Sequence, residues 1–414
     1  MVISVFGLGF VGLTTALGLA EKGHKVFGFE VDSYKINSFS VGKVPFFEPN
    51  LDTYLKKHLN SNFFINPQIS SSIKESQVIF YCVGTPYGIN GEADLTFLLK
   101  AIDTTLTHIS KSTFKTLVIK STVPPHTSTL NIIPYVKAKG FDVGVNIGVS
   151  NNPEFLREGY CWDDFMSPDR IVIGVNDKKS ENNLINLYSS FNAPIQVVNN
   201  STSEYIKYLS NTLLATMISF ANEMSIVGSK LEDIDIKNAF KILHMDKRWG
   251  NGTMKSYVYP GCGYGGYCLP KDTSAFYALS KNIGANSKLL ENVIATNTNM
   301  PNFITDQIIL NLINNQQKIG ILGLSFKPNS DDVRDSPSYK IISTLKLKGY
   351  QNIIAHDPVA MSEFKKHYLF DSFANDLSEL ITNSDILVLL TSWPEYKELK
   401  KLTSKKILDF RYFL

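Results

Sequence analysis

The start of the chain decides its fold, in the stretch VISVFGLGFVG at residues 2–12. The apolar run VISVF predicts a buried strand, and it leads directly into the pattern G-x-G-x-x-G made by Gly7, Gly9 and Gly12. The first glycine permits a tight turn, the second lets the backbone approach a pyrophosphate, and the third lets the next helix pack against the strand. The stretch therefore predicts the strand, turn and helix of a dinucleotide-binding domain.

The second strand specifies the dinucleotide. The letters KVFGFE end at Glu30, where a carboxylate can accept hydrogen bonds from both ribose hydroxyls and would repel a 2′-phosphate. This favours NAD over NADP. Phe10 and Val11 open the helix whose N-terminus is expected to hold the pyrophosphate. The alternative, a glycine turn used only for packing, is disfavoured because the motif lies between a strand and a helix.

The rest of the chain extends this α/β pattern. Short runs rich in Val and Ile alternate with helical segments as far as DRIVIGV, which is typical of a parallel sheet covered on both faces. From Ser201 to about Leu243 the pattern is helical, with Ser201 or Thr202 as the expected cap and Glu204 behind it. A second helical segment is expected from about Thr273 to Asn299. Strands return in QKIGILGLSF, NIIAHDP, DILVLLTSW and KKILDFR.

The prediction is therefore an α/β protein with two Rossmann-like domains joined by a central helical region that contains a long helix. The expected divisions are residues 1–200, 201–300 and 301–414, and the helical part could offer a dimer surface. The second α/β unit has Gly320 and Gly323 but no third glycine in phase, so it is expected to hold the nucleotide part of a substrate.

Composition excludes several classes of protein. A hydrophobic fraction of 43% over 414 residues supports globular cores, and a net charge of +3 without basic clusters gives no nucleic-acid face. Four scattered cysteines form no disulfide or zinc pattern, so a reduced, cytoplasmic setting and no metal are expected. The N-terminus lacks the features of a signal peptide, and Asn222 and Glu223 interrupt the most apolar segment, so no membrane span is expected.

The stretch GCGYGGYCLPKD, residues 261–272, contains the most informative cysteine. Its glycines are expected to expose the backbone to a ligand, and Lys271 and Asp272 could tune the thiolate of Cys268. A reactive thiol in an NAD-dependent enzyme can add to an aldehyde, and a second oxidation then gives a thioester that water hydrolyses. Inert packing is the commoner role of an arbitrary cysteine. It is the interpretation for Cys82 and Cys161.

Other segments offer partners for this chemistry. Thr122 in STVPPHT ends a strand, and Glu154 and Glu158 in NNPEFLREG follow another, where ligands of such sheets bind. The alternative for each acid is a helix cap or a surface position. Lys207 and Asn211 are spaced i, i+4 on the long helix, and an ordinary solvated pair is an equal alternative.

Taken together, these segments resemble the UDP-glucose/GDP-mannose dehydrogenase family over essentially the whole chain. The motifs occur in the order GLGFVG, VGTP, STVPP, NPEFLREG, PDRIVIG, EYIKYLSNTLLATMISFANE, GYGGYCLPKD, LSFKPNSDDVRDSP and LDFR. The resemblance implies an N-terminal NAD domain, a central dimerisation region and a C-terminal nucleotide-sugar domain. It also implies oxidation of a nucleotide sugar at C6 to a carboxylate with two NAD.

The resemblance further implies residue roles. Cys268 corresponds to the nucleophile, Lys207 to a lysine that stabilises an oxyanion, and Asn211 to its partner on the same helix. Asp272 corresponds to an aspartate linked to thiolate tuning or water activation. Thr122 and Glu154 are expected to hold a water. The residues expected beside NAD are Gly7, Gly9, Phe10, Val11, Gly12, Glu30, Lys35, Thr85, Thr122, Glu158, Lys271 and Arg334. Those expected beside the nucleotide sugar are Glu154, Phe155, Leu156, Lys207, Asn211, Arg248, Tyr257, Gly265, Phe326 and Lys327.

The chain departs from the family pattern in two places. Glu30 stands where an aspartate is usual, and the segment around Arg248, which corresponds to an arginine that reaches the partner subunit's substrate, is longer than in some members. The letters YGGYCLPKD, with Tyr267 beside the cysteine, are most similar to bacterial members that act on UDP-glucose. The alternatives are another nucleotide sugar, such as a UDP-N-acetylhexosamine or GDP-mannose, a single-step hydroxyacid dehydrogenase and a non-catalytic nucleotide-binding protein.

Overall fold

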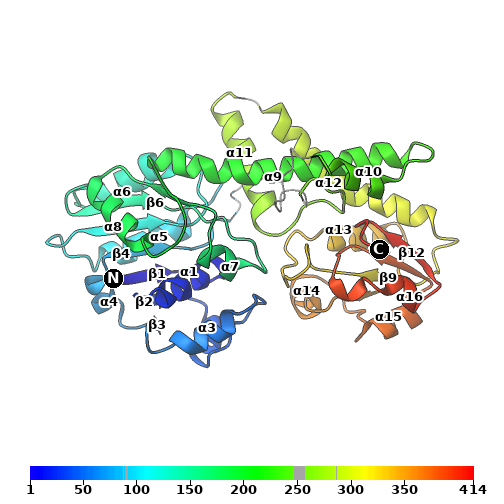
Figure 1. The fold of residues 1–414 in the computed structure, drawn as a ribbon, viewed down its shortest axis with the longest axis horizontal. Helices are drawn as coiled ribbons and strands as arrows, with labels where there is room; N and C mark the ends of the chain where they lie inside the picture. The colour runs from blue at the N-terminus through cyan, green and yellow to red at the C-terminus, as the bar shows by residue number, and fades with distance from the viewer. Residues whose placement is uncertain (87, 89–91, 247–256, 286) are drawn as a thin grey trace. The chain divides into compact units, whose positions relative to one another are not determined.

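The computed structural model describes residues 1–86, 88, 92–246, 257–285 and 287–414. The chain forms two compact units, Met1–Leu209 and Ser210–Leu414, and each contains a β-sheet flanked by helices (Figure 1). Within the described ranges, no helix has the length and apolar character needed to cross a membrane. The division into three parts that the sequence suggests stays a prediction.

The N-terminal unit contains an eight-stranded sheet in the order β3-β2-β1-β4-β5-β6-β7-β8. Its strands are β1 (Val2–Phe6), β2 (Lys25–Phe29), β3 (Phe63–Ile65), β4 (Val78–Tyr81), β5 (Lys115–Ile119), β6 (Ile147–Asn151), β7 (Ile171–Gly174) and β8 (Ile195–Val198). Neighbours are parallel except β6 and β7, which are antiparallel, so the predicted parallel sheet contains one antiparallel pair. The sequence pattern missed β3, which has only three residues, and β8, which is half-exposed at the sheet edge.

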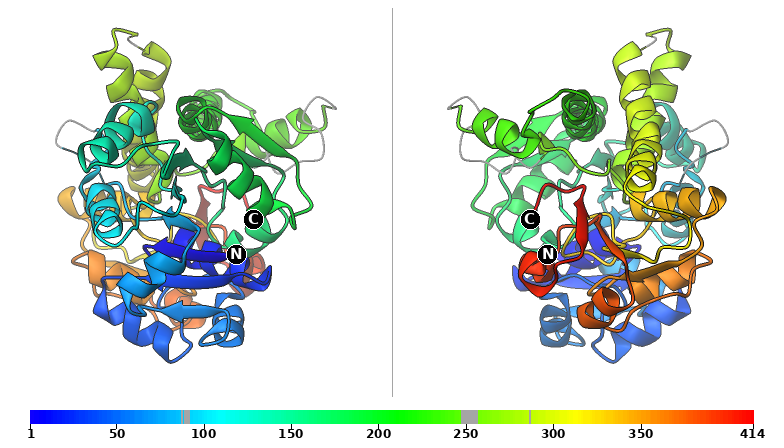
Figure 2. Two further views of the ribbon diagram at one scale, coloured as in Figure 1. Left: turned by 90° about the vertical axis from the view of Figure 1, so that its left-hand side faces the viewer. Right: turned by 90° about the vertical axis from the view of Figure 1, so that its right-hand side faces the viewer.

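Helices cover both faces of this sheet (Figure 2). One face packs against α1 (Phe10–Glu21), α2 (Ser33–Ser40), α3 (Leu51–His58), α7 (Cys161–Met166) and α8 (Lys178–Tyr188). The other packs against α4 (Ile69–Glu75), α5 (Thr96–Leu106), the π-helical turn η1 (Thr127–Ile132) and α6 (Ile133–Ala138). In β4, Val78 and Phe80 enter the first core while Ile79 and Tyr81 enter the second. Burying each such side chain contributes about 1.5–3 kcal/mol, which explains the uninterrupted apolar run.

The long helix is α9 (Asn200–Ser229), and the boundary between the two units falls inside it. Asn199 caps α9 by accepting the Thr202 N–H, so the expected cap at Ser201 or Thr202 is wrong by two or three residues. The predicted helix to Leu243 is broken after Ser229, because Asp233 takes a positive φ of 60° and Asp235 starts a separate helix. That helix is α10 (Ile236–Leu243).

In the C-terminal unit, two helices precede a smaller sheet. The helices are α11 (Cys268–Asn282) and α12 (Lys288–Leu310), where one helix was expected from Thr273 to Asn299. The sheet has the order β10-β9-β11-β12 and is wholly parallel. Its strands are β9 (Ile319–Leu322), β10 (Ile353–His356), β11 (Ile386–Leu389) and β12 (Lys406–Asp409). The helices α12, α13 (Pro337–Leu347) and α14 (Met361–His367) cover one face, and α15 (Leu377–Thr382), η4 (Pro394–Tyr396) and α16 (Leu399–Leu402) cover the other.

Candidate active site

The glycine turn after β1 has the geometry that the sequence predicts. Gly7 has a φ of 85°, which favours glycine, and a Cβ at Gly12 would lie 1.7 Å from the carbonyl oxygen of Gly7. No other atom lies within 4 Å of the Cβ position of Gly9, so this glycine faces open space. Helix α1 starts at Phe10 without a side-chain cap or an acidic residue in its first turn. Its N-terminus therefore suits a pyrophosphate, with Phe10 and Val11 in the first turn.

Glu30 follows β2 and faces this turn. Its Oε2 accepts a hydrogen bond from the Leu8 N–H at 3.1 Å, and its Oε1 accepts from the N–H groups of Val31 and Asp32. The ammonium of Lys35 lies 3.7 Å from Oε2. A carboxylate has about four acceptor positions, so capacity remains for a ribose hydroxyl. The role of Lys35 beside the cofactor stays a prediction.

A buried ion pair joins the loop that follows β6 to helix α9. The Lys207 ammonium on α9 lies 2.7 Å from Oε1 of Glu154, and both side chains are almost fully buried. Oε2 of Glu154 accepts the N–H of Leu156, and the Lys207 ammonium also lies over the ring of Phe155 at 5.6 Å. Although burial opposes ionisation, the charge of Lys207 holds the pKa of Glu154 below its usual value. The structure thus excludes a helix cap for Glu154 and a solvated surface position for Lys207.

Thr122 lies just beyond the end of β5, the strand that pairs with β6 in the sheet. The hydroxyl of Thr85 donates to the Thr122 carbonyl at 2.9 Å, so the two predicted cofactor residues belong to adjoining loops. Ser121 braces the same loops by donating to the Val83 carbonyl at 2.6 Å. The carboxyl ends of parallel strands are the ligand edge of such sheets, so these placements agree with a site there.

Glu158 is half-buried in the loop that leads to α7, and its predicted position near the cofactor is untested. A residue that the sequence did not reveal holds this loop. The buried carboxylate of Glu48 accepts the N–H groups of Gly159 at 2.7 Å and Cys161 at 2.8 Å. Glu48 precedes these residues by more than a hundred positions, so no local sequence pattern could have identified the contact.

A second buried polar cluster occurs in the C-terminal unit. Asn211 on α9 donates from Nδ2 to Oδ2 of Asp272 at 2.6 Å, and the ammonium of Lys271 pairs with Oδ1 of the same carboxylate. All three side chains are buried. Asn211 is one helical turn beyond Lys207, and both are buried against a carboxylate. The alternative of a solvated i, i+4 pair is therefore wrong.

Cys268 is the first residue of α11, and it is exposed. Asp272 lies one turn further along the same helix, and Tyr267 precedes the thiol. An N-terminal position on a helix favours the thiolate, because the helix dipole places partial positive charge there. The thiol can thus be reached by a substrate, and an acceptor and an ammonium are buried one turn away.

The glycines before Cys268 serve a purpose other than the expected exposure of the backbone. A Cβ at Gly265 would lie 2.7 Å from the Asp335 carbonyl oxygen and 3.1 Å from Cβ of Phe326, and one at Gly266 would meet the Phe326 ring at 2.9 Å. A Cβ at Gly261 would likewise lie 2.5 Å from the Arg411 guanidinium. The glycines allow close packing with other loops of the C-terminal unit, and the approach of a ligand to this backbone stays a prediction.

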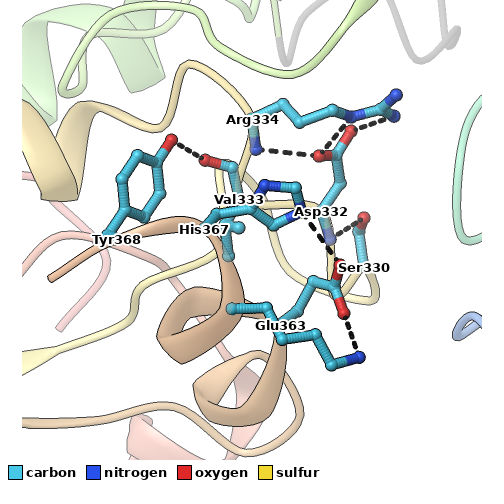
Figure 3. A network of polar contacts seen from close by, with 8 residues as sticks. Ser330, Asp332, Val333, Arg334, Glu363, His367 and Tyr368 are labelled. Carbon is cyan, nitrogen blue, oxygen red and sulfur yellow. Dashed lines mark hydrogen bonds and ion pairs between the residues drawn. The ribbon is translucent and has the colours of Figure 1, made fainter. Parts of the chain in front are cut away.

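The loop between β9 and α13 contains the predicted Arg334. Its guanidinium forms a bidentate ion pair with Asp332, at 2.9 and 2.7 Å, as Figure 3 shows. The same guanidinium lies over the Tyr267 ring at 4.6 Å, and the Gly266 N–H donates to the Arg334 carbonyl. The Tyr368 hydroxyl donates to the Val333 carbonyl at 2.7 Å. The Arg334 loop and the Cys268 loop are therefore joined directly.

The remaining predicted substrate residues have simpler surroundings. Phe326 is half-buried in the β9–α13 loop, and the Lys327 ammonium lies over its ring at 5.3 Å. Tyr257 is half-buried, and Arg248 lies outside the described residues. Sequence reasoning missed Asp357, which follows β10 as Glu30 follows β2. Its signal was available, because the letters AHDP place an acid at the end of the second strand of an α/β unit.

The other cysteines are packing residues. Cys161 and Cys262 are buried, and burial raises the pKa of both thiols, to about 11 for Cys262. Cys82 is half-buried beside the glycine turn, and burial raises its pKa to about 12. The described residues contain no group of three His, Cys, Asp or Glu side chains arranged to hold a metal.

The glycine turn, the open helix N-terminus and Glu30 define a dinucleotide-dependent dehydrogenase of the doubly wound α/β class. Family models agree domain by domain. Residues 1–192 match the NAD binding domain of the UDP-glucose/GDP-mannose dehydrogenase family, residues 201–299 its central domain and residues 320–414 its UDP binding domain. The chain belongs to the UDP-glucose/GDP-mannose dehydrogenase family.

Individual relatives are similar over nearly their whole length. The UDP-glucose 6-dehydrogenase of Rickettsia prowazekii is 39% identical over 430 residues, covering 100% of this chain and 96% of the relative. The GDP-mannose 6-dehydrogenase of Pseudomonas aeruginosa is 32% identical, covering 100% and 97%. The solved UDP-glucose dehydrogenase of Pyrobaculum islandicum superposes with a TM-score of 0.91 at 33% identity, covering 99% and 94%.

Proposed function

We propose that the protein oxidises UDP-glucose at C6 to UDP-glucuronate. The observation that carries this proposal is the exposed Cys268 at the start of α11, with the buried Asp272 one turn behind it, in a chain that also has the NAD binding domain. The UDP binding domain and relatives named UDP-glucose 6-dehydrogenase support the substrate.

The proposed reaction consists of two oxidations and one hydrolysis. The C6 alcohol loses a hydride and a proton to give an aldehyde, and the Cys268 thiol adds to its carbonyl carbon. The resulting thiohemiacetal loses a second hydride and proton to give a thioester. Water then releases the carboxylate and returns the thiol. NAD, when bound, accepts one hydride in each oxidation.

The buried charges suit this sequence of steps. The Lys207 ammonium can stabilise the oxygen that becomes negative at C6, because charge stabilisation is strong where water is excluded. Glu154 holds that ammonium at 2.7 Å. Thr122 lies beyond the end of β5, which pairs with β6, and this supports a water position between Thr122 and Glu154. Asp272 can accept a proton near Cys268, with Asn211 and Lys271 fixing its orientation.

A Cys268→Ser variant tests the nucleophile. The wild type should form two NADH for each UDP-glucuronate, whereas Cys268→Ser should form no acid, because an oxygen ester or a stalled aldehyde replaces the thioester. Titration with NAD should give similar affinities for both proteins. Full acid production by the variant would refute the assignment of Cys268.

A second substrate class keeps the same steps. The 32% identity to a GDP-mannose 6-dehydrogenase favours GDP-mannose as the first alternative, with a UDP-N-acetylhexosamine as another. Turnover of all three sugars with NADH stoichiometry separates these cases. A protein inactive on UDP-glucose but active on a relative would overturn the substrate assignment. One NADH per product would instead indicate a single-step hydroxyacid dehydrogenase.

We also propose that the protein is a homodimer in the cytoplasm. Apolar side chains are exposed along one stripe of α9, at Leu213, Phe220, Met224 and Val227. A second copy would cover this stripe, and the four cysteine thiols support a reducing compartment. Light scattering should show a dimer for the wild type and a monomer for Phe220→Glu. Leu369→Glu, on a fully exposed position elsewhere, is the matched control.

A further inference from the structure

Lys120 is a buried lysine that the proposed steps do not use. It follows β5 directly, it is 4% exposed, and its ammonium donates to Oδ1 of Asn152 at 2.9 Å. It forms no ion pair with any carboxylate in the described part of the chain. Burying an ammonium in this way costs free energy that an apolar side chain at the same position would not cost. The position therefore calls for a reason beyond packing.

Asn152 is the centre of a buried hydrogen-bond network. Its Oδ1 also accepts the Tyr188 hydroxyl at 2.6 Å, its Nδ2 donates to the Val172 carbonyl at 2.7 Å, and its backbone N–H donates to Ile119. This network fixes the backbone just after β6. Glu154 is two residues further on, so Lys120 fixes the segment from which the Glu154 carboxylate projects.

The charges around Glu154 give Lys120 a second effect. Lys120 and Lys207 are two buried ammonium groups near one buried carboxylate, and both lower the pKa of Glu154. Burial lowers the pKa of Lys120 to about 8, Cys82 and Glu154 raise it, and Lys207 lowers it further. These groups come from the ends of β4, β5 and β6 and from α9, and Tyr188 of α8 is the other titratable group on Asn152.

We propose that Lys120 is a positioning residue, which holds Glu154 through Asn152 and keeps that carboxylate ionised and paired to Lys207. This inference rests on the proposed function, because the pair is taken to act on the C6 oxygen. While Lys120 carries its proton, Glu154 stays fixed against Lys207. When Lys120 loses its proton, the charge that stabilises Glu154 is reduced and the grip on Asn152 weakens.

Three variants test the inference. Lys120→Met removes the charge, Lys120→Arg keeps a charge at every accessible pH, and Lys115→Met is the matched control. Lys115 is the buried lysine at the other end of β5, also 4% exposed, and its ammonium donates to the Lys74 carbonyl. Thermal unfolding establishes that each variant is folded before activity is measured.

We expect kcat for UDP-glucose in the wild type to fall as pH rises through about 8, the pH at which Lys120 loses its proton. Lys120→Arg should move this fall to higher pH, while Lys120→Met should lower kcat about tenfold at pH 7 because Glu154 is misplaced. The KM for NAD should stay within about twofold, since the glycine turn is untouched. Lys115→Met should keep the wild-type pH profile.

A folded Lys120→Arg variant with the wild-type pH profile would overturn the inference. Failure of the proposed function is a different outcome, in which the wild type itself does not oxidise UDP-glucose. The inference is then judged from a crystal structure of Lys120→Met. The Glu154–Lys207 distance should rise above 2.7 Å, and an unchanged distance with Asn152 in place would also overturn the inference.

Discussion

The two sheets repeat one arrangement of strands around different loops. In the N-terminal unit four neighbouring strands have the order β2-β1-β4-β5, and in the C-terminal unit β10-β9-β11-β12 is its counterpart. Gly7 and Gly323 follow the first strand in each, both with positive φ, and each donates its N–H to the end of the neighbouring strand. After Gly7 the helix starts at Phe10, whereas after Gly323 it starts only at Pro337.

The carboxylates that follow the second strand of each unit, Glu30 and Asp357, also have different surroundings. Glu30 accepts three backbone N–H groups and keeps capacity for a ligand. Asp357 accepts six hydrogen bonds, from the backbone of Leu324, Ser325, Val359 and Ala360, from the Ser325 hydroxyl and from the Trp393 indole. The comparison teaches that an acid at one position of an α/β frame keeps acceptor capacity in one unit and is fully used as a structural brace in the other.

The largest expected effect comes from removing the brace. Asp357→Ala removes the acceptor of six hydrogen bonds, so the free energy of unfolding of the C-terminal unit should fall by at least about 4 kcal/mol. Urea denaturation followed by tryptophan fluorescence measures this, because Trp393 contacts Asp357. A loss below about 1 kcal/mol would contradict the structural role that distinguishes Asp357 from Glu30.

The glycine turn gives the next effect. Gly12→Ala should destabilise the protein by about 3 kcal/mol, because its Cβ would lie 1.7 Å from the Gly7 carbonyl. Gly9→Ala is the matched variant, since its Cβ meets nothing within 4 Å. It should leave thermal stability nearly unchanged and weaken NAD binding. Equal stability losses in both variants would contradict the separate roles of the two glycines.

Glu204 is a third buried carboxylate, and it accepts fewer hydrogen bonds than Asp357. Glu204 on α9 accepts the Ser128 N–H, but burial raises its pKa to about 7. The folded state therefore binds the extra proton between pH 4.5 and about 7, and stability falls as pH rises through this window. Glu204→Gln should raise the free energy of unfolding at pH 8 by up to about 3 kcal/mol and leave it unchanged below pH 4. Thermal unfolding at both pH values measures the difference, and a pH-independent effect would contradict it.

The smallest effect on stability is expected at Glu30. Glu30→Gln should change the free energy of unfolding by less than about 1 kcal/mol, because the amide oxygen still accepts backbone N–H groups. It should raise the KM for NAD about tenfold and narrow the preference over NADP, since the charge that repels a 2′-phosphate is gone. Initial rates with both cofactors measure this. An unchanged NAD preference would show that Glu30, like Asp357, is only a brace.

Local features of the molecule were predictable from sequence, and long-range contacts were not. The turn at Gly7–Gly12 and the strand ends at Glu30 and Thr122 follow from patterns a few residues long. The pairing of Lys207 with Glu154 joins residues 53 positions apart, and that of Asn211 with Asp272 joins residues 61 apart. The spacing of Lys207 and Asn211 places them on one helix, but burial decides their role, and burial depends on packing that no short pattern contains.

The different environments of the four thiols have a practical consequence. Burial raises the pKa of Cys82, Cys161 and Cys262, whereas Cys268 is exposed at a helix start. A single equivalent of an alkylating reagent at neutral pH should therefore modify the native protein at one sulfur, without any engineering. Mass spectrometry of that adduct would count competent molecules in a preparation. The same sulfur would be the first to form a sulfenic acid under peroxide.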